Sequence, residues 1–166
     1  MKNMTYHRII ELDSILKRKS CFLLGPRQTG KSWIIRNRYE QAKTYNLLEV
    51  DTYRALGRRP VLLREEITRP GSLVIIDEIQ LLPELLNEVH LLIEERDIRF
   101  LLTGSSARKL KKQGVNLLGG RASWKSLLPL VKKEIGADFD LHKVLSRGSL
   151  PSIYSSDFYQ ADLKDY

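Results

Sequence analysis

The chain has 166 residues, of which 42% are hydrophobic and 29% are charged, so it has the composition of a globular protein rather than of a disordered one. This length favours a single domain, and no apolar run reaches the ~18 residues of a membrane span or forms the core of an N-terminal signal peptide. The single cysteine, Cys21, excludes an internal disulfide framework and favours a reducing compartment, and the three histidines stand apart without metal-ligand spacing. We therefore expect a cytoplasmic domain without membrane contact.

The formal net charge of +8 is concentrated in one part of the chain. Nine lysines and arginines and no acidic residue lie between Ile98 and Lys133. Three interpretations fit: binding of nucleic-acid phosphates, contact with another domain or subunit, or a solvated surface. The run RKLKK contains no aromatic residue for base stacking, and Trp124 lies in an expected strand, where a place in the core is the more ordinary role.

Hydrophobic periodicity and turn residues predict alternating helices and strands. Apolar residues recur on one helical face in segments such as 8–18, whereas short apolar runs stopped by glycine or proline, such as 21–25, are typical of buried strands. The expected elements are a helix over 8–18, a strand over 21–25, a helix over 31–39, a strand over 44–51, a helix over 61–68, a strand over 72–77, a helix over 82–96, a strand over 98–104, a short helix from 105, a strand over 121–130 and helices over 130–136 and 140–146. This alternation predicts an α/β fold, in which helices cover both faces of a parallel sheet.

Residues 25–32, GPRQTGKS, have the Gly-x-x-x-x-Gly-Lys-Ser spacing of a phosphate-binding loop. In such a loop the glycines let backbone N–H groups converge on phosphate oxygens, the lysine contacts the β- and γ-phosphates, and the Ser32 hydroxyl binds Mg²⁺. A chance match in a glycine turn is the alternative, but the motif follows an expected strand and opens an expected helix. The predicted nucleotide-binding residues are Gly25, Pro26, Arg27, Gln28, Thr29, Gly30, Lys31, Ser32 and Trp33.

The strand LVIID ends in Asp77, which is followed by Glu78. Ligands of open parallel sheets lie at the carboxyl ends of the strands, so Asp77 is expected to hold Mg²⁺ and its water shell. Glu78 is suited to orient and activate an attacking water. The plainer alternative is that both carboxylates begin a solvated loop. A second acid beside the first favours hydrolysis of ATP over phosphate transfer to a metabolite.

The remaining parts of a hydrolytic site are a polar group near the γ-phosphate and an arginine that neutralises charge in the transition state. At the end of the strand FLLTG, Ser105 is the first candidate for the polar group and Thr103 the second, with helix capping as the alternative for Ser105. Arg121 and Arg108 are the arginine candidates, in this chain or in the site of a neighbour, although a surface role suits each at least as well and is favoured for Arg108. Asp51 at the end of the expected second strand could also reach the site, but helix capping is the plainer role for it.

The ordered motifs GPRQTGKS (25–32), DEIQ (77–80), TGSS (103–106) and GRA (120–122) resemble a family of bacterial and archaeal AAA-type P-loop ATPases. The segment RGSLPSIY (147–154) is similar to a Gly-Gly-x-Pro-x-x-Tyr stretch of the family, with Ser149 in place of the second glycine. The resemblance implies a three-layer α/β/α P-loop NTPase sandwich with five parallel strands in the order 5-1-4-3-2. It also implies ATP and Mg²⁺ as cofactors and gives Gln80 a place in the signature without a physical role.

Family members usually continue into a further C-terminal domain. The resemblance therefore implies an ATPase core over residues 1–136 and a short helical extension over 137–166 that leads toward a domain outside this chain. We expect an ATP-hydrolysing module that acts on that domain or on a protein partner, with assembly into a homo-oligomer and nucleic-acid binding as open alternatives. The other functional candidates are a nucleotide-gated switch with little turnover and, less favoured, a small-molecule kinase.

Overall fold

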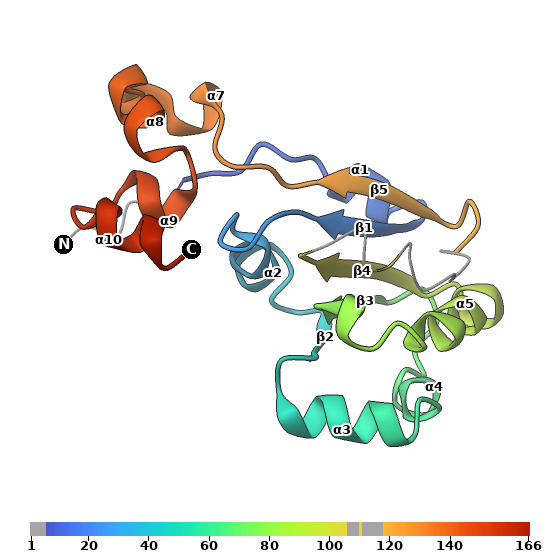
Figure 1. Cartoon of the computed structure of the whole chain (residues 1–166). Coiled ribbons are helices and arrows are strands. Elements are labelled where there is room, and N and C mark those ends of the chain that lie inside the picture. The colour runs from blue at the N-terminus through green and yellow to red at the C-terminus, as the bar shows by residue number, and fades with distance from the viewer. Residues whose placement is uncertain (1–5, 106–109, 111–117) are drawn as a thin grey trace.

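The computed structural model describes residues 6–105, 110 and 118–166, and its centre is a parallel β-sheet (Figure 1). The strands are β1 (Ser20–Leu24), β2 (Lys43–Asn46), β3 (Leu73–Asp77), β4 (Arg99–Gly104) and β5 (Ala122–Ser126). They are hydrogen-bonded in the order β2-β3-β4-β1-β5, all parallel. This is the predicted order 5-1-4-3-2 read from the other edge, so the predicted sheet is confirmed.

Helices cover both faces of the sheet because its central strands are apolar on both sides. In β1, Phe22 and Leu24 belong to the hydrophobic cluster under one set of helices, whereas Cys21 and Leu23 belong to the cluster on the opposite face. The helices around the sheet are α1 (Asp13–Leu16), α2 (Lys31–Arg38), α3 (Val50–Arg58), α4 (Leu62–Glu66) and α5 (Leu85–Arg96), with a 3-10 turn η1 (Ile79–Leu81) after β3. Residues of α1 and α2 pack on one face and residues of α3, α4 and α5 on the other, which gives three layers.

Three expected elements differ clearly in extent from those in the structure, and most of the short helix expected from residue 105 lies outside the described residues. The strand expected over 121–130 is the shorter β5, which ends at Ser126. The helix expected over 8–18 is reduced to α1, because residues 8 and 10 instead offer their backbone carbonyls to Arg38. The strand expected over 44–51 ends at Asn46, where the Asn46 side chain accepts a hydrogen bond from the Leu48 N–H group and turns the chain into α3. The helix α3 was not expected, and Asp51 lies exposed in its first turn.

The C-terminal part consists of short helices grouped beside the carboxyl ends of the strands (Figure 1). They are α7 (Lys132–Ile135), the 3-10 turn η2 (Gly136–Asp138), α8 (Leu141–Arg147), α9 (Pro151–Tyr154) and α10 (Tyr159–Lys164). A small hydrophobic cluster holds the group together and joins it to the N-terminal segment through Tyr6. Within the described ranges, no helix is long and apolar enough to cross a membrane.

Candidate nucleotide-binding site

The loop between β1 and α2 has the backbone conformation that its glycines permit. Gly30 precedes α2 with φ of 95°, in the left-handed region that glycine adopts without strain. Gly25 is subject to a steric constraint that the sequence does not indicate. A Cβ atom at Gly25 would lie 2.1 Å from the Leu127 carbonyl oxygen, and the Gly25 N–H group donates to the Gly104 carbonyl at 3.2 Å. The first glycine therefore permits the close approach of the segment after β5.

Lys31 lies buried at the start of α2, with its ammonium group turned into the loop. Its Nζ atom donates to the carbonyls of Gly25 at 2.7 Å and Pro26 at 2.8 Å, and the Thr29 hydroxyl donates to the same Pro26 carbonyl at 2.9 Å. Burial lowers the pKa of Lys31, and the nearby carboxylates Glu78 and Asp77 oppose part of this shift. The cation is therefore fixed among the atoms of the loop and faces two acids.

Asp77, at the carboxyl end of β3, is held by hydroxyl groups from two sides. The Ser32 hydroxyl donates to Asp77 Oδ2 at 3.2 Å, and the Thr103 hydroxyl donates to Asp77 Oδ1. Thr103 is fully buried in the neighbouring strand β4 and also accepts the Glu78 N–H group at 3.3 Å. Ser32 and Asp77 thus lie together as predicted, whereas Thr103 supports the two acids from within the sheet.

Glu78 follows β3 in the left-handed conformation, with φ of 60°, which is uncommon for a residue with a side chain. Its carboxylate accepts a hydrogen bond from Nε2 of Gln80, in the turn η1. The same Nε2 atom donates to Ser105 Oγ at 3.1 Å. Two residues predicted at the site, Glu78 and Ser105, are therefore joined by a third, for which the sequence indicates no role.

These groups surround one cavity of about 620 Å³ at the carboxyl edge of the sheet. Its lining comes from the loop and the start of α2, from Glu78 and Gln80, from Ser105, and from Ser152 of α9. The Gln28 side chain accepts a hydrogen bond from the Ser152 hydroxyl at 2.7 Å, and the Arg27 carbonyl accepts one from the Tyr166 hydroxyl at 3.3 Å. Both loop residues therefore contact the C-terminal part of the chain as well as the cavity.

The structure does not bring Arg121 to this cavity. The residue directly precedes β5, which is parallel to β1, so it lies at the amino edge of the sheet, opposite the loop. Its side chain forms an ion pair with Glu94 of α5. Delivery of Arg121 to the site of a neighbouring chain remains a prediction, and Arg108 lies outside the described residues.

Arg8 is a buried residue of the loop region that sequence reasoning missed. Its guanidinium group donates to the Thr29 carbonyl, to the Leu128 carbonyl at 2.6 Å and to the Glu134 carboxylate at 2.9 Å. The sequence indicates a helix at this position, so its only visible signal is a charged residue beside apolar ones. Arg8 ties the phosphate loop to the segment that follows β5.

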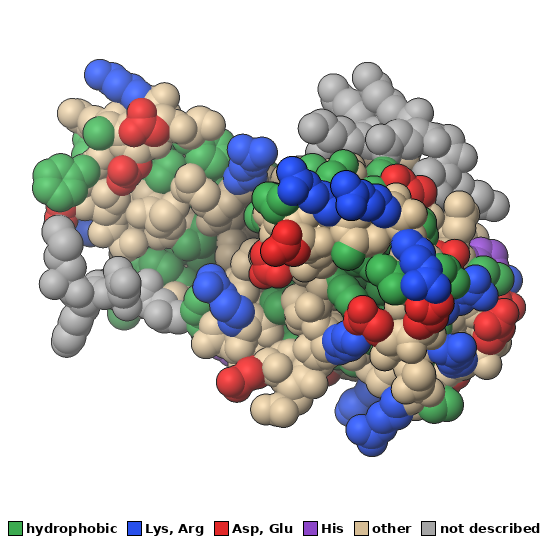
Figure 2. All heavy atoms as spheres, turned by 90° about the horizontal axis from the view of Figure 1, so that it is seen from below, with side chains coloured by type: hydrophobic (Ala, Val, Ile, Leu, Met, Phe, Trp, Pro, Cys, Tyr) green, Lys and Arg blue, Asp and Glu red, His purple; other side chains and the backbone are tan. Residues whose placement is uncertain are grey.

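The basic segment is partly neutralised by acids outside it. Arg99 pairs with Asp97 at 3.0 Å and Arg121 pairs with Glu94, while Arg108, Lys109, Lys111 and Lys112 lie outside the described residues. Trp124 is 39% exposed and stacks on Phe22 with ring centroids 4.4 Å apart, so it is only partly in the core. On the face that Figure 2 presents, basic and acidic side chains are interspersed.

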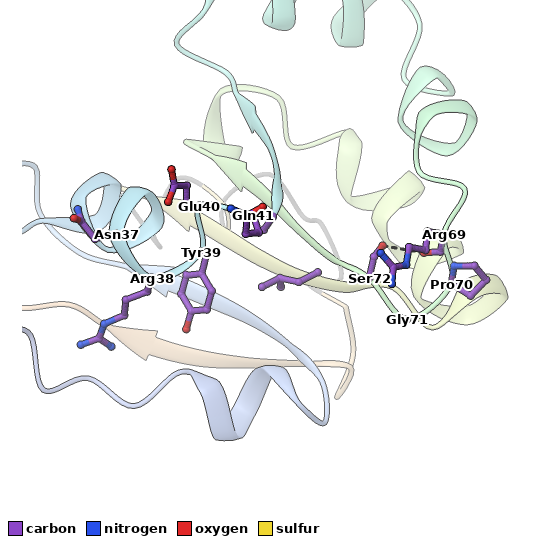
Figure 3. Close-up of a pocket in the computed structure, with 11 residues that line it drawn as sticks. Asn37, Arg38, Tyr39, Glu40, Gln41, Arg69, Pro70, Gly71 and Ser72 are labelled. Carbon is purple, nitrogen blue, oxygen red and sulfur yellow. Dashed lines mark hydrogen bonds between the residues drawn. The ribbon is translucent and has the colours of Figure 1, made fainter.

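A second cavity of about 610 Å³ lies at the amino edge of the sheet, between the end of α2 and residues 69–73 (Figure 3). The Ser72 hydroxyl donates to the Arg69 carbonyl at 2.9 Å within its wall. None of the predicted site residues lines it. In the described part of the chain, no group of three or more His, Cys, Asp or Glu side chains could hold a metal ion by itself.

Comparison with known proteins matches residues 17–136 to the AAA domain family. Comparison with curated proteins gave no match. Among solved structures, the fold is similar to a Walker-type ATPase of Pyrococcus abyssi, with a TM-score of 0.53, 15% identity, and coverage of 86% of this chain and 62% of the other. It is also similar to the Orc1 protein of Aeropyrum pernix in complex with DNA, with a TM-score of 0.51, 16% identity, and coverage of 89% and 55%.

The chain thus spans about three fifths of the length of the solved structures that it resembles. At these identities the structures establish the shared fold, and the sequence match over most of the chain establishes the family. The chain belongs to the AAA domain family and contains its P-loop ATPase core.

Proposed function

We propose that this chain binds ATP together with Mg²⁺ and that an activated water hydrolyses the bond between the β- and γ-phosphates. The observation that carries the proposal is the convergence of Lys31, Glu78 and Ser105 on one cavity, with Ser32 at its wall and Asp77 directly behind. These groups come from the loop and from the ends of two strands that are adjacent in the sheet. A chance glycine turn would not account for the presence of these groups around one cavity.

The residues present fit a magnesium nucleotide. The Ser32 hydroxyl and the Asp77 carboxylate lie 3.2 Å apart and are oxygen ligands of the kind that Mg²⁺ prefers. The metal, when bound, would neutralise phosphate charge. Residues 25–33 would surround the phosphates, and Lys31 would exchange its loop carbonyls for phosphate oxygens.

Hydrolysis assigns separate roles to the polar groups of the cavity. Glu78 would orient a water and accept its proton, while Ser105 would donate a hydrogen bond to the γ-phosphate. Lys31, Arg27 and Arg36 already line the cavity in this chain. Arg121 of a neighbouring chain would add the further positive charge that neutralises the transition state. This last assignment requires a homo-oligomer.

We further propose that the C-terminal helices transmit the nucleotide cycle to another part of the protein or to a partner. We place the ATPase core at residues 1–136 and treat residues 137–166 as a helical extension that transmits the cycle to a further domain or protein partner. The contacts of Ser152 and Tyr166 with the loop support such transmission. A nucleotide-gated switch with little turnover is the second candidate, and the presence of Glu78 in the cavity speaks against it.

The test is ATP turnover and Mg²⁺-ATP affinity of the parent chain beside Lys31→Ala and Glu78→Gln. We expect Lys31→Ala to lose nucleotide affinity, and Glu78→Gln to keep it while turnover falls by about 10²- to 10⁴-fold, the usual contribution of a general base. Unchanged affinity in Lys31→Ala would contradict the binding site. Equal turnover in Glu78→Gln would contradict the role of the water-activating acid.

A further inference from the structure

Gln80 stands between the two groups that face the γ-phosphate in the proposed function. It is buried in η1, and its Nε2 atom donates to Glu78 Oε2 and to Ser105 Oγ, the latter at 3.1 Å. An amide NH₂ group has two donor hydrogens, one for each partner. A single side chain therefore links the end of β3 to the end of β4.

The chemistry of the partners fixes the direction of these hydrogen bonds. An ionised carboxylate only accepts, so the amide nitrogen of Gln80 must face Glu78. Among the described residues no hydrogen bond reaches the other carboxylate oxygen of Glu78, which is therefore available to a water. Ser105 Oγ accepts from Gln80 and therefore keeps its own hydrogen for another acceptor. Gln80 thus presents Glu78 as a proton acceptor and Ser105 as a hydrogen-bond donor.

The neighbouring strand is shaped to admit this amide. A Cβ atom at Gly104 would lie 2.2 Å from Gln80 Oε1, which is closer than two non-bonded atoms can approach. Gly104 is not in the left-handed conformation, so the need for glycine here arises from the close approach of Gln80 rather than from the backbone. The amide oxygen is buried and has no hydrogen-bond partner among the described residues, so burial of Gln80 costs free energy that only its NH₂ contacts offset.

We propose that Gln80 is a positioning residue that sets the geometry of Glu78 and Ser105 together, so that the water-activating acid and the phosphate-contacting serine are aligned as one unit. This inference rests on the proposed function for its effect on turnover. It rests on the structure alone for the two hydrogen bonds. Among the described residues, no hydrogen bond joins Gln80 to Lys31 or to the Ser32–Asp77 pair, so we expect it to act on the chemical step rather than on nucleotide binding.

The kinetic test compares Gln80→Ala and the isosteric Gln80→Glu with the parent. We expect kcat to fall by about 10- to 100-fold, the worth of a hydrogen bond to a charged group, while the KM for ATP changes by less than about threefold. In a Glu78→Gln background, Gln80→Ala should cause a smaller further loss of kcat, because only the alignment of Ser105 then remains to be lost. The proposal would be overturned by a kcat within about twofold of the parent or above it, or by a rise in KM as large as the fall in kcat.

A second test does not depend on turnover. In the NMR spectrum of the parent, the two side-chain amide protons of Gln80, identified by their loss in Gln80→Ala, should respond separately: Glu78→Gln should shift one and Ser105→Ala the other. If neither responds, the link is absent even when the chain hydrolyses ATP. If both respond in a chain without turnover, the link stands and the proposed hydrolysis fails.

Gly104→Ala supplies a steric control. The added methyl should displace the Gln80 amide and lower kcat as Gln80→Ala does. Its effect should be smaller in a Gln80→Ala background, where the Leu24 side chain, 3.3 Å away, is the remaining close contact. Should Gly104→Ala fail to fold alone, recovery of the folded state in the double variant is the expected result. Equal losses in both backgrounds would contradict the contact.

Discussion

Gly25 opens the phosphate loop, yet its nearest constraint is the backbone of Leu127. We predict that Gly25→Ala unfolds at a markedly lower temperature and loses nucleotide binding, because the new Cβ atom would collide with a carbonyl group that cannot rotate away. Gly57→Ala is the matched control. In α3 its Cβ atom would make an ordinary contact at 3.6 Å with Leu82, and alanine should stabilise the helix by about 0.5 to 1 kcal/mol. Thermal unfolding of both variants checks the prediction, and equal unfolding temperatures would contradict it.

Cys21 offers a second prediction at the level of one side chain. It is fully buried in β1, and burial raises the pKa of its thiol to about 11. The reactive thiolate is therefore scarce at neutral pH and out of reach of reagents. We expect no reaction with a thiol reagent such as dithionitrobenzoate at pH 8 until the chain is unfolded by denaturant. Rapid modification of the native protein would show that β1 opens readily.

At the level of elements, the Arg8–Glu134 pair joins the N-terminal segment to α7. Both side chains are about 95% buried, and the Glu134 carboxylate also accepts the N–H groups of Ile9 and Val131. Burial by itself raises the Glu134 pKa, but these hydrogen bonds together hold the pKa below its ordinary value of 4.5. The ionised form therefore stabilises the fold above pH 4.5, and this stabilisation is lost as the pH falls through the lowered pKa.

We predict that Glu134→Gln costs about 3 to 5 kcal/mol at pH 7, because Arg8 is left buried without its counter-charge. The difference from the parent should narrow as the pH falls below 4.5, since protonation then removes the same charge from the parent. Urea unfolding at pH 7 and at acid pH measures both values. Glu65→Gln is the control, since its pair with Arg59 is exposed and should change stability by less than about 1 kcal/mol.

The three central strands β1, β3 and β4 could be predicted from the sequence because their residues form short apolar runs. The boundaries of β2 and α3 could not, since the turn between them depends on the Asn46 side chain and on Leu56, which packs into the core. Likewise, the length of α1 is limited by Arg38, whose partners lie about thirty residues earlier in the chain. Contacts between distant residues decided what local periodicity left open.

At the scale of the whole molecule, one hydrophobic cluster crosses the expected boundary between residues 136 and 137. Tyr6, Leu130 and Ile135 pack with Tyr154 of α9, and Phe139 and Val144 pack around them. We predict that a chain ending at residue 136 is less stable than the full chain and binds the dye ANS, because half of this cluster is removed. A chain ending at residue 157 keeps the cluster and serves as the control. Equal stability of all three chains would support the expected boundary as a true domain limit.

In the candidate site, too, some residues could be predicted from local sequence patterns, whereas others depend on contacts with residues distant in the chain. Residues of the loop and the Asp77–Glu78 pair are recognisable because their spacing and their place after a strand are local. Arg8 and Gln80 are not, because their partners are set by the tertiary fold: Arg8 meets Thr29 and Glu134, and Gln80 meets Ser105. Arg121 stands at the start of a strand in the predicted parallel sheet, so its place at the amino edge, opposite the loop, could have been inferred from the sequence.

The placement of the two tryptophans has an optical consequence. Trp33 lines the cavity beside Ser32, whereas Trp124 stacks on Phe22 at the edge strand. Intrinsic fluorescence should therefore report two regions separately, with the emission of Trp33 changing when Mg²⁺-ATP is added and that of Trp124 staying constant until the sheet opens. A Trp124→Phe variant should keep the full nucleotide response and a Trp33→Phe variant should lose it. Trp33 should thus serve as an intrinsic fluorescent probe of nucleotide binding, and Trp124 as an internal reference.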